Sequence, residues 1–253
     1  METLLACRDG NLKWYTEETG GVTAGSENRI HFGMNRLGHI TVYAYDVARL
    51  YVWERKFWVS KNIRPDGGVC PELLQAQQEC RVAKTRPPEH LIISAMEWFD
   101  ECCKNKYQVS PLRDHHEIGD IAKRLHRFRA LDENGLRGLA KDIVKFTVER
   151  LDKKALLNIL DTKKLNVGSL KLLQQILASV TSDEFAKEHM APLFGVYDLR
   201  GADAHLSSSD VENAYTRLGI DRQQIFLLQG KALIKSVADT IGVIGSQIKQ
   251  DQV

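Results

Sequence analysis

The sequence predicts a mainly helical chain, in which a small mixed α/β N-terminal region precedes a C-terminal helical bundle. From Asp114 onward, every periodic segment repeats its apolar side chains at three- and four-residue spacing, as helices do. The first 45 residues instead alternate short apolar pieces with turn residues. With 253 residues, 43% of them hydrophobic, the chain is long enough to bury a core. We expect two parts, residues 1–105 and residues 111–253.

The N-terminal part begins with a β-rich stretch. Turn residues occur at Asp9-Gly10-Asn11, at Gly20-Gly21 and from Asn35 to Gly38. Two hairpins or a small sheet would satisfy this pattern. The apolar pieces that we expect to form extended structure are Leu4 to Cys7, Leu12 to Tyr15, Ile30 to Phe32 and Ile40 to Tyr45.

After Tyr45 the apolar spacing becomes helical. Asp46 is a suitable helix cap. A short helix is expected around Glu72 to Cys80, and another from Pro88 to about Cys103, before Ser110-Pro111 interrupts the chain. The apolar positions of the helix expected after Asp46 are Val47, Leu50, Trp53, Phe57 and Trp58.

The C-terminal part is predicted to form a bundle of about five helices. One helix carries the stripe from Ile118 to Phe128, and others begin near Asp132, Gly168-Ser169 and Pro192, while Ser182 is expected to cap a short turn. The last, from about Gln223 to Gln250, has an apolar stripe like the a and d positions of a coiled coil. This stripe is either part of the core, the simpler interpretation, or a dimer seam. Its residues are Leu227, Ile234, Val237, Ile241, Ile244 and Ile248.

Charge is distributed unevenly along the chain. The formal net charge is only +2, but residues 104–171 hold 16 basic and 9 acidic side chains, a net charge of +7. Such a segment can hold RNA by neutralising phosphates, although a basic helical surface is more often simply solvated. The densest basic group, and our candidate for RNA binding, is Lys123, Arg124, Arg127 and Arg129.

Several classes of site are disfavoured by the sequence. It has no phosphate-binding glycine loop, no nucleophile elbow and no His-Glu-x-x-His pair. The consecutive residues His115, His116 and Glu117 would point in different directions on a helix, so we expect neither a metal nor a cofactor. The five cysteines form no CxxC pair and show no recurring spacing, which suggests a reducing compartment. Of the neighbouring Cys102 and Cys103, we expect one thiol to be buried and the other exposed. No apolar run approaches bilayer length, so we expect a cytoplasmic protein without a membrane partner.

The stretch from Tyr197 to Leu206 is the best candidate for chemistry, because it contains Arg200 and His205. Histidine titrates near neutrality and can move protons, while a guanidinium can stabilise charge on a phosphorus centre. Asp203 is the nearest group that could orient His205. Positions five apart lie about 140° apart around an ideal helix, so a bend at Gly201, the reach of Arg200 or a second chain must bring the pair together. The alternative is ordinary ion pairing, of Asp198 with Arg200 or of Asp203 with His205.

An Arg-x4-His element in an all-helical region resembles the HEPN superfamily, many of whose members are metal-independent ribonucleases of toxin and antiviral systems. The resemblance covers about residues 111–253 and rests on Arg200, His205 and the helical context. Gly201 stands where active members usually carry a polar residue. The resemblance implies a catalytic site formed where two such motifs face each other in a homodimer.

We therefore expect a metal-independent RNA endonuclease or RNA-binding effector. The alternative is a non-catalytic helical adaptor that binds a partner protein through its last helix, while the N-terminal region recognises something else. Salt dependence separates the two, because phosphate contacts weaken steeply as salt rises and an apolar interface does not. The aromatic residues that would anchor such an interface are Trp14, Trp53, Trp58 and Trp98.

Overall fold

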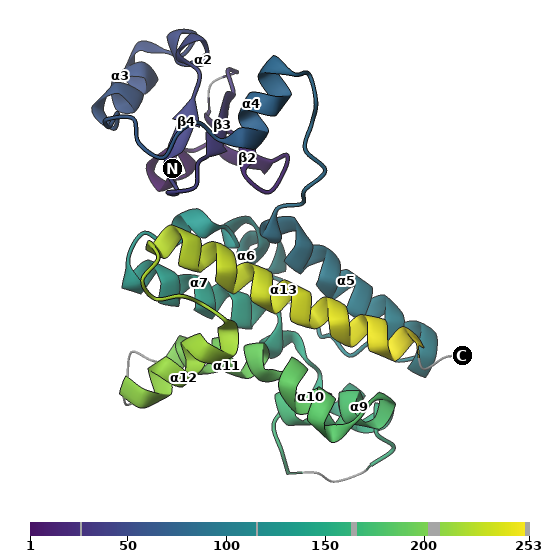
Figure 1. Ribbon diagram of the computed structural model, residues 1–253. Coiled ribbons are helices and arrows are strands. Elements are labelled where there is room, and N and C mark those ends of the chain that lie inside the picture. The colour runs from purple at the N-terminus through teal and green to yellow at the C-terminus, as the bar shows by residue number, and fades with distance from the viewer. Residues whose placement is uncertain (26, 115, 163–165, 202–207, 251–253) are drawn as a thin grey trace. The chain divides into compact units, whose positions relative to one another are not determined.

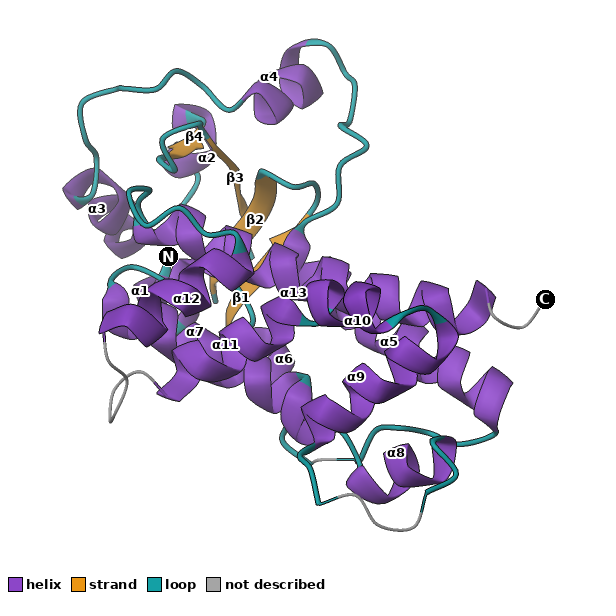
Figure 2. Cartoon of the chain, turned by 60° about the horizontal axis from the view of Figure 1, so that its bottom comes forward, coloured by secondary structure: helices purple, strands orange, loops and turns teal. Residues whose placement is uncertain are grey.

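Most of the short apolar pieces of the first 45 residues form a four-stranded antiparallel sheet with the strand order β1-β2-β3-β4 (Figures 1 and 2). The computed structural model describes residues 1–253 except 26, 115, 163–165, 202–207 and 251–253. The chain divides into two compact units, Met1–His90 and Leu91–Val253. The strands of the first unit are β1 (Gly10–Trp14), β2 (Thr19–Ala24), β3 (Ile30–Met34) and β4 (Ile40–Val42).

Gly20 and Gly21 belong to strand β2, so the prediction of a turn at this pair was wrong. Gly20 pairs with Trp14 on one side and with Phe32 on the other. A Cβ atom at Gly20 would lie only 2.7 Å from both the Lys13 carbonyl oxygen and the Phe32 ring. Glycine is present here because the neighbouring strand and ring come too close for a side chain.

Four helices accompany the sheet among the described residues of this unit, and three of them differ from the prediction. The piece from Leu4 to Cys7, predicted to be extended, begins within helix α1, and the helix predicted after Asp46 is two short helices separated at Tyr51, where the backbone is extended. Leu50 is the buried member of that predicted stripe. The helices are α1 (Glu2–Leu5), α2 (Ala44–Ala48), α3 (Val52–Ser60) and α4 (Pro71–Gln78).

The second unit begins within a long helix, earlier than the boundary predicted near residues 105–111. Helix α5 (Pro88–Tyr107) places Ile92, Met96 and Phe99 in the core of this unit. The burial of these side chains assigns the helix to the C-terminal part. The following elements are α6 (Ile118–Arg124), η1 (Arg127–Arg129), α7 (Glu133–Phe146), η2 (Val148–Arg150), α8 (Lys153–Ile159), α9 (Ser169–Val180), α10 (Asp183–His189), α11 (Ala191–Gly201), α12 (Ser208–Leu218) and α13 (Phe226–Gln250).

Two predicted caps are present. Asp132 accepts a hydrogen bond from the Gly135 amide at 2.7 Å, and Ser182 accepts one from the Phe185 amide at 3.2 Å. Each side chain satisfies an amide that the first turn of a helix leaves without a partner. The sequence therefore located the start of α7 correctly, whereas the short turn expected at Ser182 is the first turn of helix α10.

The apolar stripe of α13 is core. All six of its residues are buried within the unit. Helix α13 lies beside α5, and Gly245 permits the contact, because a Cβ there would lie 2.8 Å from the ring of Trp98 (Figure 1). The interpretation of the stripe as a core element is confirmed, and these side chains are not available as a dimer seam.

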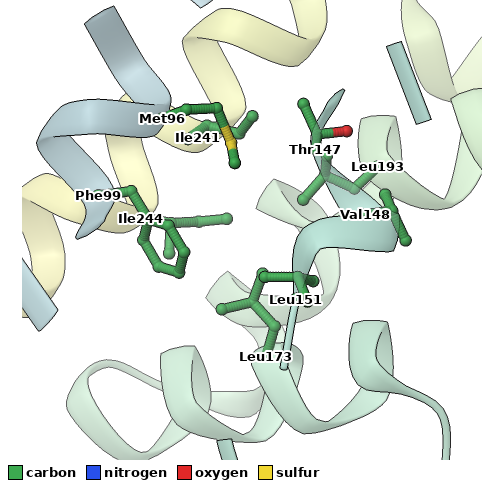
Figure 3. Close-up of a pocket in the computed structure, with 9 residues that line it drawn as sticks. All are labelled: Met96, Phe99, Thr147, Val148, Leu151, Leu173, Leu193, Ile241 and Ile244. Atoms are coloured by element: carbon green, nitrogen blue, oxygen red, sulfur yellow. The ribbon is translucent and has the colours of Figure 1, made fainter. Parts of the chain in front are cut away.

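The core of this unit contains one small apolar void (Figure 3). Its volume is about 10 Å³, which is close to the minimum that one water molecule needs. The Thr147 hydroxyl, the polar group on its wall, donates a hydrogen bond to the Ile143 carbonyl at 2.7 Å. The void offers a ligand neither room nor polar partners.

Candidate functional site around Arg200

Arg200 lies in the last turn of α11, where two side chains hold its guanidinium. Its Nη1 donates a hydrogen bond to the carboxylate of Glu149 in an ion pair. The guanidinium carbon lies 4.4 Å from the ring centroid of Tyr197, three positions earlier on the same side of the helix. These two contacts position the guanidinium while 28% of the side chain remains exposed.

The other two predicted catalytic residues, His205 and Asp203, lie outside the described residues. The catalytic assignment of Arg200, His205 and Asp203 therefore stays a prediction. One alternative is wrong: Asp198 does not pair with Arg200, because its carboxylate accepts a hydrogen bond from Arg217 at 2.7 Å. Burial raises the pKa of Asp198, and the charge of Arg217 partly opposes that effect.

Arg200 and Tyr197 form part of the wall of an open pocket of about 540 Å³. This volume falls within the range of about 300–1,000 Å³ that is usual for small-ligand sites. Four basic and three acidic side chains face the pocket, so it can attract an anion and still offer polar groups to its substituents. The basic residues are Arg113, Lys145, Arg150 and Arg200, and the acidic residues are Asp114, Glu117 and Glu149.

Arg113 fixes one wall of the pocket by bonding to the backbone. Its Nη2 donates hydrogen bonds to the carbonyl oxygens of Glu149, at 3.0 Å, and of Leu151, at 3.3 Å. The Arg113 amide also donates to the Arg150 carbonyl at 2.7 Å. The short η2 segment that carries Glu149 and Arg150 is thereby held against the segment before α6. The positions of these two side chains consequently depend on Arg113.

Arg150 is a half-buried basic group of the pocket. Its guanidinium carbon lies 5.5 Å from the centroid of the Phe146 ring, and its Nε atom is buried with no hydrogen-bond partner among the described residues. Burial lowers the pKa of Arg150, while the carboxylates of Asp100 and Asp114 act in the opposite direction. A partly dehydrated guanidinium attracts an oxyanion, which Arg150 would bind through its terminal amino groups because its Nε is buried.

The four basic residues predicted to hold RNA do not form one open surface. Arg127 is fully buried. Asp142, itself buried, accepts a hydrogen bond from Arg124 at 3.2 Å and pairs with Arg129 at 3.3 Å, and exposed Lys123 pairs with Asp120 at 2.9 Å. Arg127, through its burial, and Arg124 and Arg129, through their pairs with Asp142, therefore have structural roles. Binding of RNA by this group stays a prediction.

Sequence reasoning missed Arg113, Lys145, Glu149 and Arg150. The charge excess of residues 104–171 includes all three basic members. However, a charge excess does not show which basic side chains share a pocket. Arg113, Lys145 and Arg150 are separated by up to 37 positions (113 to 150) and line one pocket only because α7, η2 and the segment before α6 pack together.

The cysteine pair differs from its prediction. Cys102 and Cys103 are both buried, because both face the core side of α5, and the expectation of one exposed thiol was wrong. Burial raises the pKa of Cys103 to about 12, so its thiol is protonated and unreactive at neutral pH.

Two further properties concern the described residues only. No group of three or more His, Cys, Asp or Glu side chains among them is arranged to hold a metal ion, and His115 lies outside this set. None of the helices in this part of the chain combines the length and apolar composition that crossing a bilayer requires.

Comparisons with protein-family models, with curated protein sequences and with solved structures found no match to this chain.

Proposed function

We propose that this protein is an RNA-binding effector with a HEPN-like C-terminal region, and that it cleaves RNA without a metal ion. The observation that carries the proposal is the pocket of about 540 Å³ that Arg200 lines together with Arg113, Lys145 and Arg150. A cluster of guanidinium groups is well suited to phosphate, because each presents a planar fork of donors to the oxygens.

The proposed reaction divides the work between Arg200 and His205. His205 accepts the proton of the ribose 2′-hydroxyl while the 2′-oxygen attacks phosphorus. The bond from phosphorus to the 5′-oxygen then breaks, and that oxygen takes a proton from the imidazolium. The products are a 2′,3′-cyclic phosphate and a 5′-hydroxyl. Arg200 stabilises the extra negative charge on the non-bridging oxygens, and Asp203 orients His205.

The biological setting follows from the same resemblance. We propose that the protein acts in the cytoplasm as a homodimer, in a toxin or phage-defence system. Because the apolar stripe of α13 is occupied within the chain, the dimer must use another surface.

A cleavage assay tests the proposal. The purified chain is incubated with total tRNA and a labelled single-stranded RNA in EDTA, beside the Arg200→Ala and His205→Ala variants. The wild type is expected to leave 2′,3′-cyclic phosphate ends, and each variant to lose this activity. Equal activity in all three proteins would disprove the assigned roles, and no cleavage by any of them would favour the adaptor hypothesis.

A further inference from the structure

Helix α3 has half-buried Phe57 and Trp58 on its inner face and further apolar side chains on its outer face. Its one buried side chain is Glu54, which is 2% exposed, whereas Val52, Trp53 and Val59 face solvent. Apolar side chains on the outer face of a helix expose area that folding alone would bury. Such an arrangement indicates a binding surface.

Aromatic and basic side chains alternate on this part of the first unit. Directly after α2, the guanidinium carbon of Arg49 lies 5.7 Å from the centroid of the Tyr45 ring, four positions earlier. In α3, Trp53 and Lys56 are three positions apart and therefore neighbours on the helix surface. Helices α2 and α3 contact each other, and exposed Tyr51 joins them. We call Tyr45, Arg49, Tyr51, Trp53 and Lys56 the aromatic–basic surface.

The charge around this surface is positive and not neutralised. Residues 44–64 carry five basic side chains, all exposed, and none forms a salt bridge among the described residues. Of the two acidic residues in this range, Glu54 is buried and Asp46 lies 3.5 Å from His31. A negatively charged partner would therefore meet free cations next to exposed rings.

We infer that the aromatic–basic surface binds single-stranded RNA, with bases stacked on the rings and phosphates beside Arg49 and Lys56. Exposed rings with interspersed cations match the chemistry of single-strand binding, in which each base offers a π-face and each nucleotide a negative charge. In duplex RNA the faces of the bases are covered by their neighbours, so the surface selects unpaired strands. The inference rests on the proposed function and adds the form of RNA that the protein takes.

Two other partners fit the surface less well. An amphipathic helix that lies on a membrane separates its apolar side from its basic side, whereas Val52, Arg55, Lys56 and Val59 mix on the outer face of α3. The core of a protein–protein interface is depleted in lysine, but Lys56 lies beside Trp53.

Fluorescence titration of the full-length His205→Ala chain tests the inference, since this background separates binding from cleavage. The probes are a short oligouridylate and an RNA duplex of the same length, in EDTA. The oligouridylate is expected to quench tryptophan fluorescence and to bind about tenfold more weakly to Trp53→Ala, the order expected when one stacked base is lost. Trp53→Phe should lose most of the quenching and retain the affinity, which for both Trp53 variants is measured from the anisotropy of a labelled oligouridylate. Duplex binding should change little in either variant.

A matched pair of charge variants covers the case in which Trp53→Ala fails to fold. The double variant Arg49→Ala/Lys56→Ala is expected to weaken oligouridylate binding and to reduce the salt dependence of that binding. The control double variant, Arg81→Ala/Lys84→Ala, removes the same charges at exposed positions in the same unit and should change neither. Unchanged affinity in the first double variant would overturn the inference. Binding to phosphatidylserine vesicles in place of RNA, lost in the same variants, would also overturn it and favour a membrane.

The two proposals can fail separately. If the proposed nuclease is wrong, RNA stays uncut while the aromatic–basic surface still binds the oligouridylate. If the surface is wrong, its variants bind the oligouridylate like the parent chain, whatever the outcome of the cleavage assay.

Discussion

Arg200 and Glu149 form an ion pair at the wall of the proposed phosphate pocket, although 51 positions separate them in the sequence. A phosphate that approached Arg200 would have to compete with this carboxylate. Glu149 therefore sets the strength with which the pocket attracts an anion.

Replacing Glu149 with glutamine should strengthen RNA binding several-fold, because it removes a negative charge and weakens the hold on Arg200. Fluorescence anisotropy with a labelled RNA measures the change. Glu188→Gln, the same substitution at an exposed position outside the pocket, is the control and should leave the affinity unchanged. Weaker binding by Glu149→Gln would show that the carboxylate supports the site.

Asp142→Asn should destabilise the fold, because the Asp142 carboxylate is buried and pairs with both Arg124 and Arg129. Loss of the charge leaves two guanidinium groups poorly compensated, at a cost of about 2 kcal/mol. Urea denaturation gives the free energy of unfolding. Asp120→Asn, which removes only the exposed partner of Lys123, should have little effect. The structural role of Asp142 would be refuted if both variants unfolded at the same urea concentration as the wild type.

The apolar stripe of α13 leads to a prediction about stability. Ile234→Ala should lower the free energy of unfolding by about 2–5 kcal/mol, because the side chain is fully buried. Ile225→Ala, at a side chain that is 49% exposed, should cost far less. Urea denaturation and sedimentation provide the readout. An Ile234→Ala chain that kept its stability but lost a dimeric state would contradict the placement of the stripe in the core.

The thiols should react in an order set by their burial. Cys80 is exposed, whereas burial raises the pKa of Cys70, Cys102 and Cys103. Because the thiolate is the reacting form, iodoacetamide at neutral pH should modify Cys80 first and leave Cys103 intact until denaturant is added. Peptide mass spectrometry identifies the modified positions. Modification of native Cys103 as fast as Cys80 would be incompatible with the packing of α5.

Local sequence signals predicted the fold class and most of the elements. The caps Asp132 and Ser182 and the stripe of α13 are short-range patterns, and each is present in the structure. Helices α8 and α12 were missed. Gly20-Gly21 misled the prediction because a glycine in a turn and a glycine beneath a neighbouring ring look alike in sequence.

The candidate site was predictable only in part. Arg200 was recognisable from its spacing to His205, but the residues around it come from several segments and share no motif. The high local density of basic residues in the sequence pointed instead to Arg124, Arg127 and Arg129. In the structure Arg124 and Arg129 pair with Asp142, and Arg127 is buried. Burial of a basic residue depends on tertiary packing, and local spacing does not report it.

The central claim is that the Arg200 pocket holds an RNA phosphate, and equilibrium binding of a labelled single-stranded RNA tests it most directly. The His205→Ala chain, with and without Arg200→Ala, is titrated in EDTA between about 50 and 200 mM salt. His205→Ala with Lys235→Ala, an exposed lysine outside the pocket, is the control. Adding Arg200→Ala to the His205→Ala chain removes one phosphate contact. It should weaken RNA binding about tenfold and reduce the slope of log affinity against log salt by about 0.7, whereas the Lys235 control should change neither quantity. An affinity and slope equal to those of the Lys235 control would contradict the account.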